Sequence, residues 1–335
     1  MRLTEIEAIK AVRSRESQPL FPAPAQLLAP DLNPAPAGMK QRLARKLAPW
    51  LLPFRAFAAE RAHGRLLPEV TGCHYVVGHR FADDWACRRF ALAAGGWQGK
   101  RVLLPGAHFN SGEARDWFRR PVSELHLLDI VDWTPSLNEA QNQVQALCRG
   151  RLFFHHGTLD RLPLPDASMD MMESRAVLEH VGNMRDTAAE MARVLVPGGL
   201  ALHSIGPLYY CHGGDHCIGA YGLEHGYDHL LLDDDEYTRR LMDEAAFQSF
   251  GREASDARYW AIQKIFSYLK PAEYLEAFAP WFECHTVLAK ISAEALAFRK
   301  ARPEAWMKLL ATRLTEADLL IDGLTVILKK TCEPG

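Results

Sequence analysis

The sequence has little that points to a membrane-spanning, secreted or disulfide-stapled protein. No apolar run approaches the roughly 20 residues that a bilayer-spanning helix needs, and the opening MRLTEIEAIKAVRSRE lacks the long apolar stretch of a secretory signal. The seven cysteines are odd in number, scattered along the chain and never spaced as CxxC. These absences predict a reduced, cytoplasmic protein.

An excess of charge of one sign is also missing. The 39 basic and 41 acidic side chains leave a formal net charge of -2, so a surface that wraps nucleic acid is not expected. Apolar residues make up 48% and charged residues 24% of the 335 residues. Both values are ordinary for a globular protein and exclude global disorder. The length suits one large domain or one domain with an appendage.

Proline is concentrated near the start of the chain. Residues 19–53 hold eight of the 20 prolines. Because proline fixes φ and has no N–H donor, residues 19–38 are predicted to be an extended linker. The proline density and the lack of a periodic apolar pattern also predict that residues 1–38 contribute nothing to the core. Residues 1–65 are therefore expected to form a proline-rich linker and a basic segment, ahead of one main domain at residues 66–335.

The basic segment, residues 40–65, carries seven Lys or Arg and one Glu among Leu, Trp and Phe. Two interpretations remain open. The segment is either a helix that docks on the domain and turns its basic face to water, or an amphipathic segment that lies on an anionic membrane surface. Pro49 and Pro53 argue against one long helix in either case.

Apolar runs alternate with helical patterns through the rest of the chain. This alternation predicts right-handed βαβ units and an α/β fold with a mostly parallel sheet. Strands are expected at residues 101–106, 124–130, 151–155, 169–174, 200–205, 284–290 and 324–330. Helices are expected at residues 113–120, 136–148 and 186–195.

A long segment, about residues 207–283, separates the fifth predicted strand from the sixth. A connection of that size inside a compact domain is usually a lid or a binding insertion. Ligands of open α/β sheets bind beyond the carboxyl ends of the strands. Because the segment leaves from such an end, it is predicted to form a substrate lid.

The most specific motifs lie within residues 157–205. They are LPLPD at 162–166, MD at 169–170, LEH at 178–180 and ARVLVPGG at 192–199. In order and spacing these pieces resemble the core of class I S-adenosylmethionine-dependent methyltransferases of the small-molecule type. The resemblance implies a Rossmann-like sheet of seven strands with the last strand antiparallel, and S-adenosylmethionine as the cofactor.

A glycine-bearing loop follows the first predicted strand. Gly106 matches the first glycine of the family's cofactor loop, whereas His108 and Asn110 stand where later glycines are usual. Glycine permits close backbone approach to a nucleotide-type ligand, and Asn tolerates positive φ better than most residues. The resemblance thus implies that Gly106, His108 and Asn110 contact the cofactor. The altered loop also leaves open a protein that keeps the fold without methyl transfer.

Further cofactor contacts are predicted at the ends of the following strands. Asp129 lies 23 residues after Gly106, close to the spacing at which a carboxylate binds ribose hydroxyls. Asp132 is the second candidate, and a solvent-exposed turn acid remains an alternative. The other predicted cofactor contacts are Thr158 and Leu159, which would flank the adenine, and Ser174.

Histidines crowd the predicted insertion. Five of the 14 histidines lie between residues 203 and 229, interleaved with Cys and Asp. Three interpretations are open: a pocket of packed side chains, a transition-metal site, or a catalytic base. The spacings match no structural zinc pattern, so no metal site is predicted. As a base, His216 would be oriented by Asp215 or Asp228 and would accept a substrate proton. His180 would lie under the substrate or would hydrogen-bond the following helix.

The leading prediction is a cytoplasmic methyltransferase that acts on an oxygen of a small-molecule or glycan-type acceptor. The glycan-type acceptor is suggested by a weaker resemblance: GPLYYCHGGDH, residues 206–216, is similar to a segment of methyltransferases from bacterial polysaccharide pathways. One alternative is a non-catalytic binding or scaffold subunit with the same fold, and another is a quinone, lipid or nitrogen acceptor. Nucleic acid is not an expected partner, while peripheral membrane contact through residues 40–65 remains open.

Overall fold

A computed structural model describes residues 3–21, 38–78, 82–106, 120–132, 151–217, 222–243 and 260–331. The predicted helices at residues 113–120 and 136–148 and most of the predicted linker lie outside the described residues.

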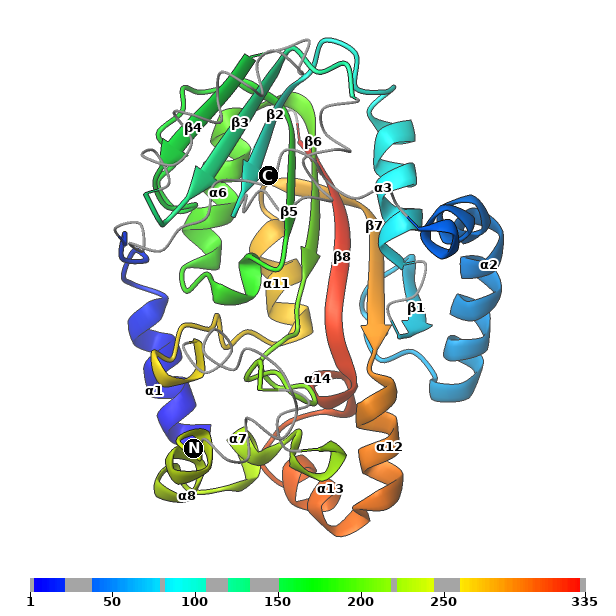
Figure 1. Cartoon of the computed structure of the whole chain (residues 1–335), viewed down its shortest axis with the longest axis vertical. Helices are drawn as coiled ribbons and strands as arrows, with labels where there is room; N and C mark the ends of the chain where they lie inside the picture. The colour runs from blue at the N-terminus through cyan, green and yellow to red at the C-terminus, as the bar shows by residue number, and fades with distance from the viewer. Residues whose placement is uncertain are drawn as a thin grey trace.

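One eight-stranded sheet organises the chain, in the order β1-β7-β8-β6-β5-β2-β3-β4 (Figure 1). Strand β8 is antiparallel to β6 and β7, and the other neighbours are parallel. The predicted α/β fold class is therefore confirmed, and all seven predicted strands are present. The strands are β1 Cys73–Val77, β2 Arg101–Pro105, β3 Glu124–Asp129, β4 Arg151–His156, β5 Met169–Arg175, β6 Leu195–Ile205, β7 Phe282–Ile291 and β8 Ile321–Lys330. Edge strand β1 was not predicted.

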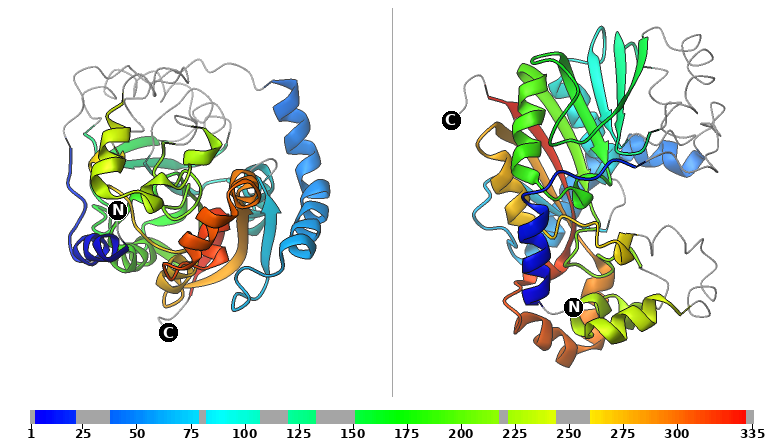
Figure 2. Two further views of the ribbon diagram at one scale, coloured as in Figure 1. Left: turned by 90° about the horizontal axis from the view of Figure 1, so that it is seen from below. Right: turned by 90° about the vertical axis from the view of Figure 1, so that its left-hand side faces the viewer.

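Successive side chains of a strand point to opposite faces of the sheet, and both faces of this sheet are buried. In β2, Leu103 belongs to a core shared with helices α6 (Met184–Val194) and α11 (Pro271–Phe278). Val102 and Leu104 belong to a second core, shared with α2 (Met39–His63) and α3 (Ala82–Ala93). The result is a three-layer arrangement with helices on either side of the sheet (Figures 1 and 2).

The PGG run lies inside strand β6 rather than in a turn before it. The pairing with β5 jumps from Met169–Leu195 to Met171–Leu200, so the run forms a bulge. Gly198 has φ +73, and a Cβ on Gly199 would lie 2.8 Å from the Val196 carbonyl oxygen. Glycine at both positions therefore lets the chain leave α6 and enter the sheet directly.

Helix α2 corrects the prediction that Pro49 and Pro53 would interrupt a long helix. It runs unbroken for 25 residues with both prolines inside it. Pro53 is exposed and Pro49 is half-buried, so the carbonyls that lose a helical donor lie on the outer side, where water reaches them. Small side chains such as Ala48 are buried against the domain, so α2 shares the core of the main domain.

The first residues also pack on the domain, contrary to the expectation that residues 1–38 contribute nothing to the core. Ile6 of helix α1 (Leu3–Arg13) is fully buried in the main core. Arg13 Nη2 donates to the His180 carbonyl at 2.5 Å, and Phe21 N donates to the Ile130 carbonyl at 2.7 Å. Leu3, Ile6 and Ile9 recur at a spacing of three residues in α1, and Leu3 and Ile9 pack partly buried against the same core as Ile6.

Three parts of the chain gather beyond the carboxyl ends of the central strands (Figures 1 and 2). They are α1, the predicted insertion, and an excursion between β7 and β8 that was not predicted. The insertion carries α7 (Asp228–Leu231) and α8 (Asp234–Leu241), and the excursion carries α12 (Ala293–Ala301), α13 (Pro303–Leu310) and α14 (Glu316–Leu320). Within the described ranges, no helix combines the length and apolar character that crossing a bilayer requires.

The packing of α1 generates a stability prediction. Replacing Ile6 with Ala removes a fully buried side chain and should lower the free energy of unfolding by about 2–5 kcal/mol, measured by urea denaturation. Val12→Ala is the matched control, because Val12 is 53% exposed on the same helix. Equal effects of the two substitutions would show that α1 does not pack on the domain in solution.

Candidate functional site

The strand order reverses between β2 and β5, and the site lies at the carboxyl ends of these strands. β2 pairs with β3 on one side and with β5 on the other, which makes this the topological switch point where α/β proteins bind ligands. Gly106, directly after β2, has φ +63, and a Cβ there would lie 2.3 Å from Val177 Cγ2. Glycine is therefore required for β2 to exit beside the end of β5.

The predicted acid Asp129 lies beside Gly106. It ends β3, and Gly106 N donates to the carbonyl of the preceding Leu128 at 2.7 Å. The Asp129 Oδ1 atom accepts from Val131 N at 2.9 Å, which fixes the carboxylate on a tight turn. The structure thus brings together two of the predicted cofactor residues. His108 and Asn110 lie outside the described residues.

The other predicted cofactor contacts are engaged with the protein itself. Leu159 is 5% exposed and belongs to the main core, and Thr158 is also buried. The Ser174 hydroxyl lies 2.7 Å from His203 Nδ1 inside the sheet. Their contact with a cofactor stays a prediction.

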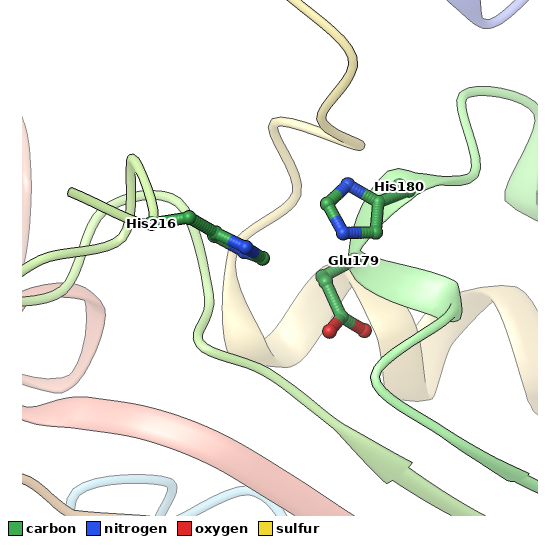
Figure 3. Close-up of side chains that lie close together, drawn as sticks. All are labelled: Glu179, His180 and His216. Atoms are coloured by element: carbon green, nitrogen blue, oxygen red, sulfur yellow. The ribbon is translucent and has the colours of Figure 1, made fainter. Parts of the chain in front are cut away.

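Glu179, His180 and His216 form a compact cluster at the end of β5 (Figure 3). Glu179 and His180 belong to the short helical turn Leu178–His180, which follows β5, whereas His216 comes from the insertion. One potential ligand atom from each residue lies within 4.8 Å of the others. The structure therefore joins two predicted catalytic residues, His180 and His216, with an acid that was not predicted.

The two imidazoles are held by specific contacts. His180 Nδ1 lies 2.7 Å from the Ile265 carbonyl oxygen; because a carbonyl only accepts, Nδ1 carries the proton and Nε2 keeps a lone pair. The His180 ring stacks on Trp260 with centroids 4.1 Å apart and lies 4.8 Å from the His216 ring. Aromatic packing thus fixes both rings.

Burial controls the protonation of the cluster. Desolvation lowers the pKa of His180 to about 3 and that of His216 to about 4. Desolvation also raises the pKa of Glu179 to about 8. The backbone N–H groups of Glu179 and Gly206 oppose this rise in pKa, but neither forms a hydrogen bond of ordinary geometry with the carboxyl group. Among the described residues, Glu179 Oε1 and Oε2 and His216 Nε2 are buried without a hydrogen-bond partner. All three groups are therefore neutral near pH 7.

The prediction that Asp215 or Asp228 orients His216 is wrong. The Asp215 carboxylate accepts from Tyr237 Oη at 2.7 Å, and Asp228 pairs with Arg240. His216 Nε2 has no hydrogen-bond partner among the described residues, which include Asp215. The charge of Asp215 acts on His216 only by opposing the desolvation that lowers the His216 pKa.

Most histidines of the insertion are packed structural residues. His212 Nε2 lies 2.7 Å from the Leu223 carbonyl and His229 Nε2 lies 2.8 Å from the Tyr209 carbonyl. His225 lies 3.0 Å from Asp228. His212 and His229 are thus buried and bonded to backbone carbonyls, whereas the His216 ring reaches His180 and Glu179.

Two polar pairs of the motif region have structural roles. Arg193 bonds Glu190 at 2.8 Å and the Leu162 and Leu164 carbonyls at 3.0 and 2.9 Å. Asp170 accepts from Arg101 N at 2.9 Å and so orders the start of β2. Neither pair belongs to the candidate site.

Comparisons with known proteins agree with this geometry. A family model described as "Methyltransferase domain" matches residues 109–203. A probable S-adenosylmethionine-dependent methyltransferase of Mycolicibacterium smegmatis is 44% identical over 54 residues, which is 16% of this chain and 21% of that protein. A dimethylglycine N-methyltransferase of Parasynechococcus marenigrum is 30% identical over 105 residues, 30% of this chain and 36% of that protein. The matched regions thus span about a fifth and about a third of these relatives.

A solved S-adenosylmethionine-dependent methyltransferase of Mesorhizobium loti superposes with a TM-score of 0.42 at 18% identity, covering 73% of this chain and 97% of the other. The family-model match coincides with the motif region, and the observed sheet order has the reversal and the antiparallel strand β8 that the motif resemblance implies. Residues 109–203 are thus similar to a methyltransferase domain, and the sheet around them has the topology that the motif resemblance implies.

Proposed function

We propose that this protein is an enzyme that transfers the methyl group of S-adenosylmethionine to an oxygen atom of a small-molecule or glycan-type acceptor. The observation that carries the proposal is that the methyltransferase-domain match at residues 109–203 contains Asp129 and begins just after Gly106, the two residues that lie side by side at the switch point.

The residues at the switch point fit the cofactor. A backbone that tolerates no Cβ at Gly106 can approach a ligand closely. The Asp129 carboxylate is held in place by the hydrogen bond that it accepts from Val131 N, and a carboxylate is the group type that accepts hydrogen bonds from ribose hydroxyls. When bound, S-adenosylmethionine supplies an electrophilic methyl carbon.

The acceptor side is assigned to the cluster at the end of β5. The proposed chemistry is an in-line displacement, in which the acceptor oxygen bonds to the methyl carbon while the carbon–sulfur bond breaks, and it depends mainly on alignment. His216 is neutral because burial lowers its pKa to about 4, so its Nε2 lone pair is available for the proton of an acceptor hydroxyl. The acceptor is proposed to be a hydroxyl, whose proton must leave as its oxygen is methylated and could be taken up by His216.

The first test is acceptor-independent: calorimetric titration of the full chain with S-adenosylmethionine and S-adenosylhomocysteine. Asp129→Ala should weaken binding by about 1.5–3 kcal/mol, roughly 10- to 150-fold in Kd, because it removes hydrogen bonds to a charged group. Asp129→Asn keeps the acceptor for Val131 N and separates loss of charge from loss of the turn. Asp132→Ala should bind like the wild type.

Two results would count against the assignment. If only Asp132→Ala abolishes binding, the wrong acid was chosen. If the wild-type chain binds neither compound, the alternative of a non-catalytic binding or scaffold subunit is favoured.

The second test addresses the acceptor side. His216→Gln keeps polarity and approximate size but cannot take up a proton, so methyl transfer should fall by about 100-fold while the Kd for S-adenosylmethionine stays near wild type. Transfer of labelled methyl groups to a panel of alcohols, phenols and glycans measures the change. Full turnover of His216→Gln across pH 6–9 would exclude proton acceptance by this residue, and methylation of an amine alone would exclude the oxygen acceptor.

The same proposal includes contact of α2 with an anionic membrane surface. The buried side of α2 faces the domain, yet an apolar stripe at spacings of three and four residues remains exposed: Met39, Leu43, Leu47, Trp50, Phe54 and Phe57. Trp50 and Phe54 are 74% and 75% exposed. An aromatic stripe of this kind on a basic helix is typical of helices that lie in the membrane interface.

Charge favours a lipid surface over a second copy of the chain as the occupant of this stripe. Residues 40–65 carry seven basic side chains and only Glu60 as an acid. Two copies meeting through this stripe would bring two helices of net positive charge together, which is unfavourable, whereas anionic lipid head groups attract such a helix.

Vesicle pelleting tests the contact. The protein should pellet with phosphatidylserine-containing vesicles at about 0.01 M salt and be released at about 1 M, because salt screens the head-group attraction. Phe54→Glu should abolish pelleting, whereas Leu92→Glu should not, since Leu92 is a similarly exposed residue on α3. If neither the wild type nor Phe54→Glu pellets with vesicles, and the wild type forms a dimer that Phe54→Glu does not form, the stripe would be assigned to a second copy of the chain.

A further inference from the structure

The cluster of Glu179, His180 and His216 combines one carboxylate and two imidazoles from two separate segments of the chain (Figure 3). We propose that these three side chains bind a divalent transition-metal ion. Binding of the ion does not depend on methyl transfer; only the role given to it below rests on the proposed function.

The carboxylate is the first observation that points to a cation. Glu179 is 1% exposed, and neither of its oxygens has a hydrogen-bond partner among the residues that the structure describes. A buried carboxyl group without partners is costly, and buried carboxylates are normally paired or bound to a metal. A cation between the three side chains would satisfy both oxygens.

The hydrogen bonding of His180 is the second observation. Its Nδ1–H donates to the Ile265 carbonyl at 2.7 Å, so its Nε2 lone pair is left as the ligand atom. Metal-bound histidines almost always make such an outer hydrogen bond, because it fixes the tautomer and the ring orientation. The stacking of the ring on Trp260 at 4.1 Å adds a second constraint.

The backbone of His216 is the third observation. A positive φ is uncommon for a residue other than glycine and persists where the surrounding structure imposes it; His216 has φ +66, with its N–H bonded to the Gly213 carbonyl at 3.0 Å. This turn directs the imidazole toward Glu179 and His180 (Figure 3). Its Nε2 is buried and has no partner within the described part of the chain.

The ligand set selects the class of ion. Two imidazoles and one carboxylate suit Zn²⁺, Co²⁺, Fe²⁺ or Mn²⁺, whereas Mg²⁺ and Ca²⁺ prefer oxygen ligands alone. The ligand atoms lie within 4.8 Å of one another, and ligands that share one ion through bonds of about 2.0–2.2 Å lie at most about 4.4 Å apart, so binding requires the three side chains to close on the ion. Three protein ligands leave a coordination position open.

The open position suits the acceptor of the proposed reaction. A metal-bound hydroxyl loses its proton more readily, so in the loaded protein the ion activates the acceptor oxygen and His216 serves as a ligand. The hydroxyl proton leaves to water, the oxygen bonds to the methyl carbon, and the carbon–sulfur bond breaks.

Metal binding by the chelator-treated full chain tests the inference directly. Equilibrium dialysis against Zn²⁺, Co²⁺ and Mg²⁺, followed by elemental analysis, should find one Zn²⁺ or Co²⁺ per chain and no retained Mg²⁺. Loading with Co²⁺ should give a visible absorption band that reports the imidazole ligands. Absence of both bound metal and the band would overturn the proposal.

Matched variants locate the site. Glu179→Gln and His216→Gln should each weaken Zn²⁺ binding by about 100-fold or more, because loss of an outer hydrogen bond alone costs 10- to 100-fold. His225→Gln is the control from the same insertion and should bind like the wild type. Glu179→Gln removes a buried unpaired carboxyl without changing its size, so it is expected to stay folded. Equal Zn²⁺ affinity in all variants would place the ion elsewhere and overturn the proposal.

S-Adenosylmethionine binding distinguishes this inference from the proposed function. Calorimetry on the same samples reports cofactor affinity, which the three substitutions should leave near wild type. A chain that binds Zn²⁺ at this site but does not bind the cofactor would refute methyl transfer and support the metal site. A chain that binds the cofactor but not Zn²⁺ would refute the metal site and leave the proposed methyl transfer in place.

Discussion

The close passage of β2 beside the end of β5 is the constraint on which the site depends. The strand order reverses at this point, and open α/β sheets bind their ligands beyond the carboxyl ends of the strands at such a reversal. Gly106 permits this passage because a Cβ there would overlap Val177. The acid that ends β3 and the Glu179–His180 turn that follows β5 are thereby brought to one edge of the sheet.

The position of that turn is then set by segments distant in the sequence. Arg13 of α1 donates to the His180 carbonyl at 2.5 Å, and Ser267 N donates to the Glu179 carbonyl at 2.6 Å. Ile265 holds the His180 ring. The N-terminal helix and the insertion therefore orient the cluster from two sides. A region with no motif of its own, residues 3–13, thus contributes to the geometry of the site.

The sequence predicts the sheet well because buried parallel strands require continuous apolar runs, which survive as a local pattern. The sequence also singles out Gly106 and Asp129 as candidate cofactor residues, because a glycine after one apolar run and an acid after the next are typical of nucleotide-type sites at strand ends. It fails where tertiary contacts override local preference. Pro49 and Pro53 are tolerated within α2, where Pro53 is exposed and Pro49 is half-buried. Strand β1 is as long as β2 but buries only two of its five residues, whereas β2 buries four.

The site itself shows why residue type and spacing were insufficient. Asp215 is the neighbour of His216 in sequence, but its carboxylate accepts from Tyr237 Oη, while His216 Nε2 has no hydrogen-bond partner among the described residues. Glu179 shows the opposite: in sequence it is an ordinary acid, and only its complete burial without a partner among the described residues makes it informative. The carboxylate expected to assist His216 is structural, while the one with no predicted role points into the cluster. The chemistry of this site is therefore decided by which polar groups the fold leaves unsatisfied, a property of the packed chain rather than of any local pattern.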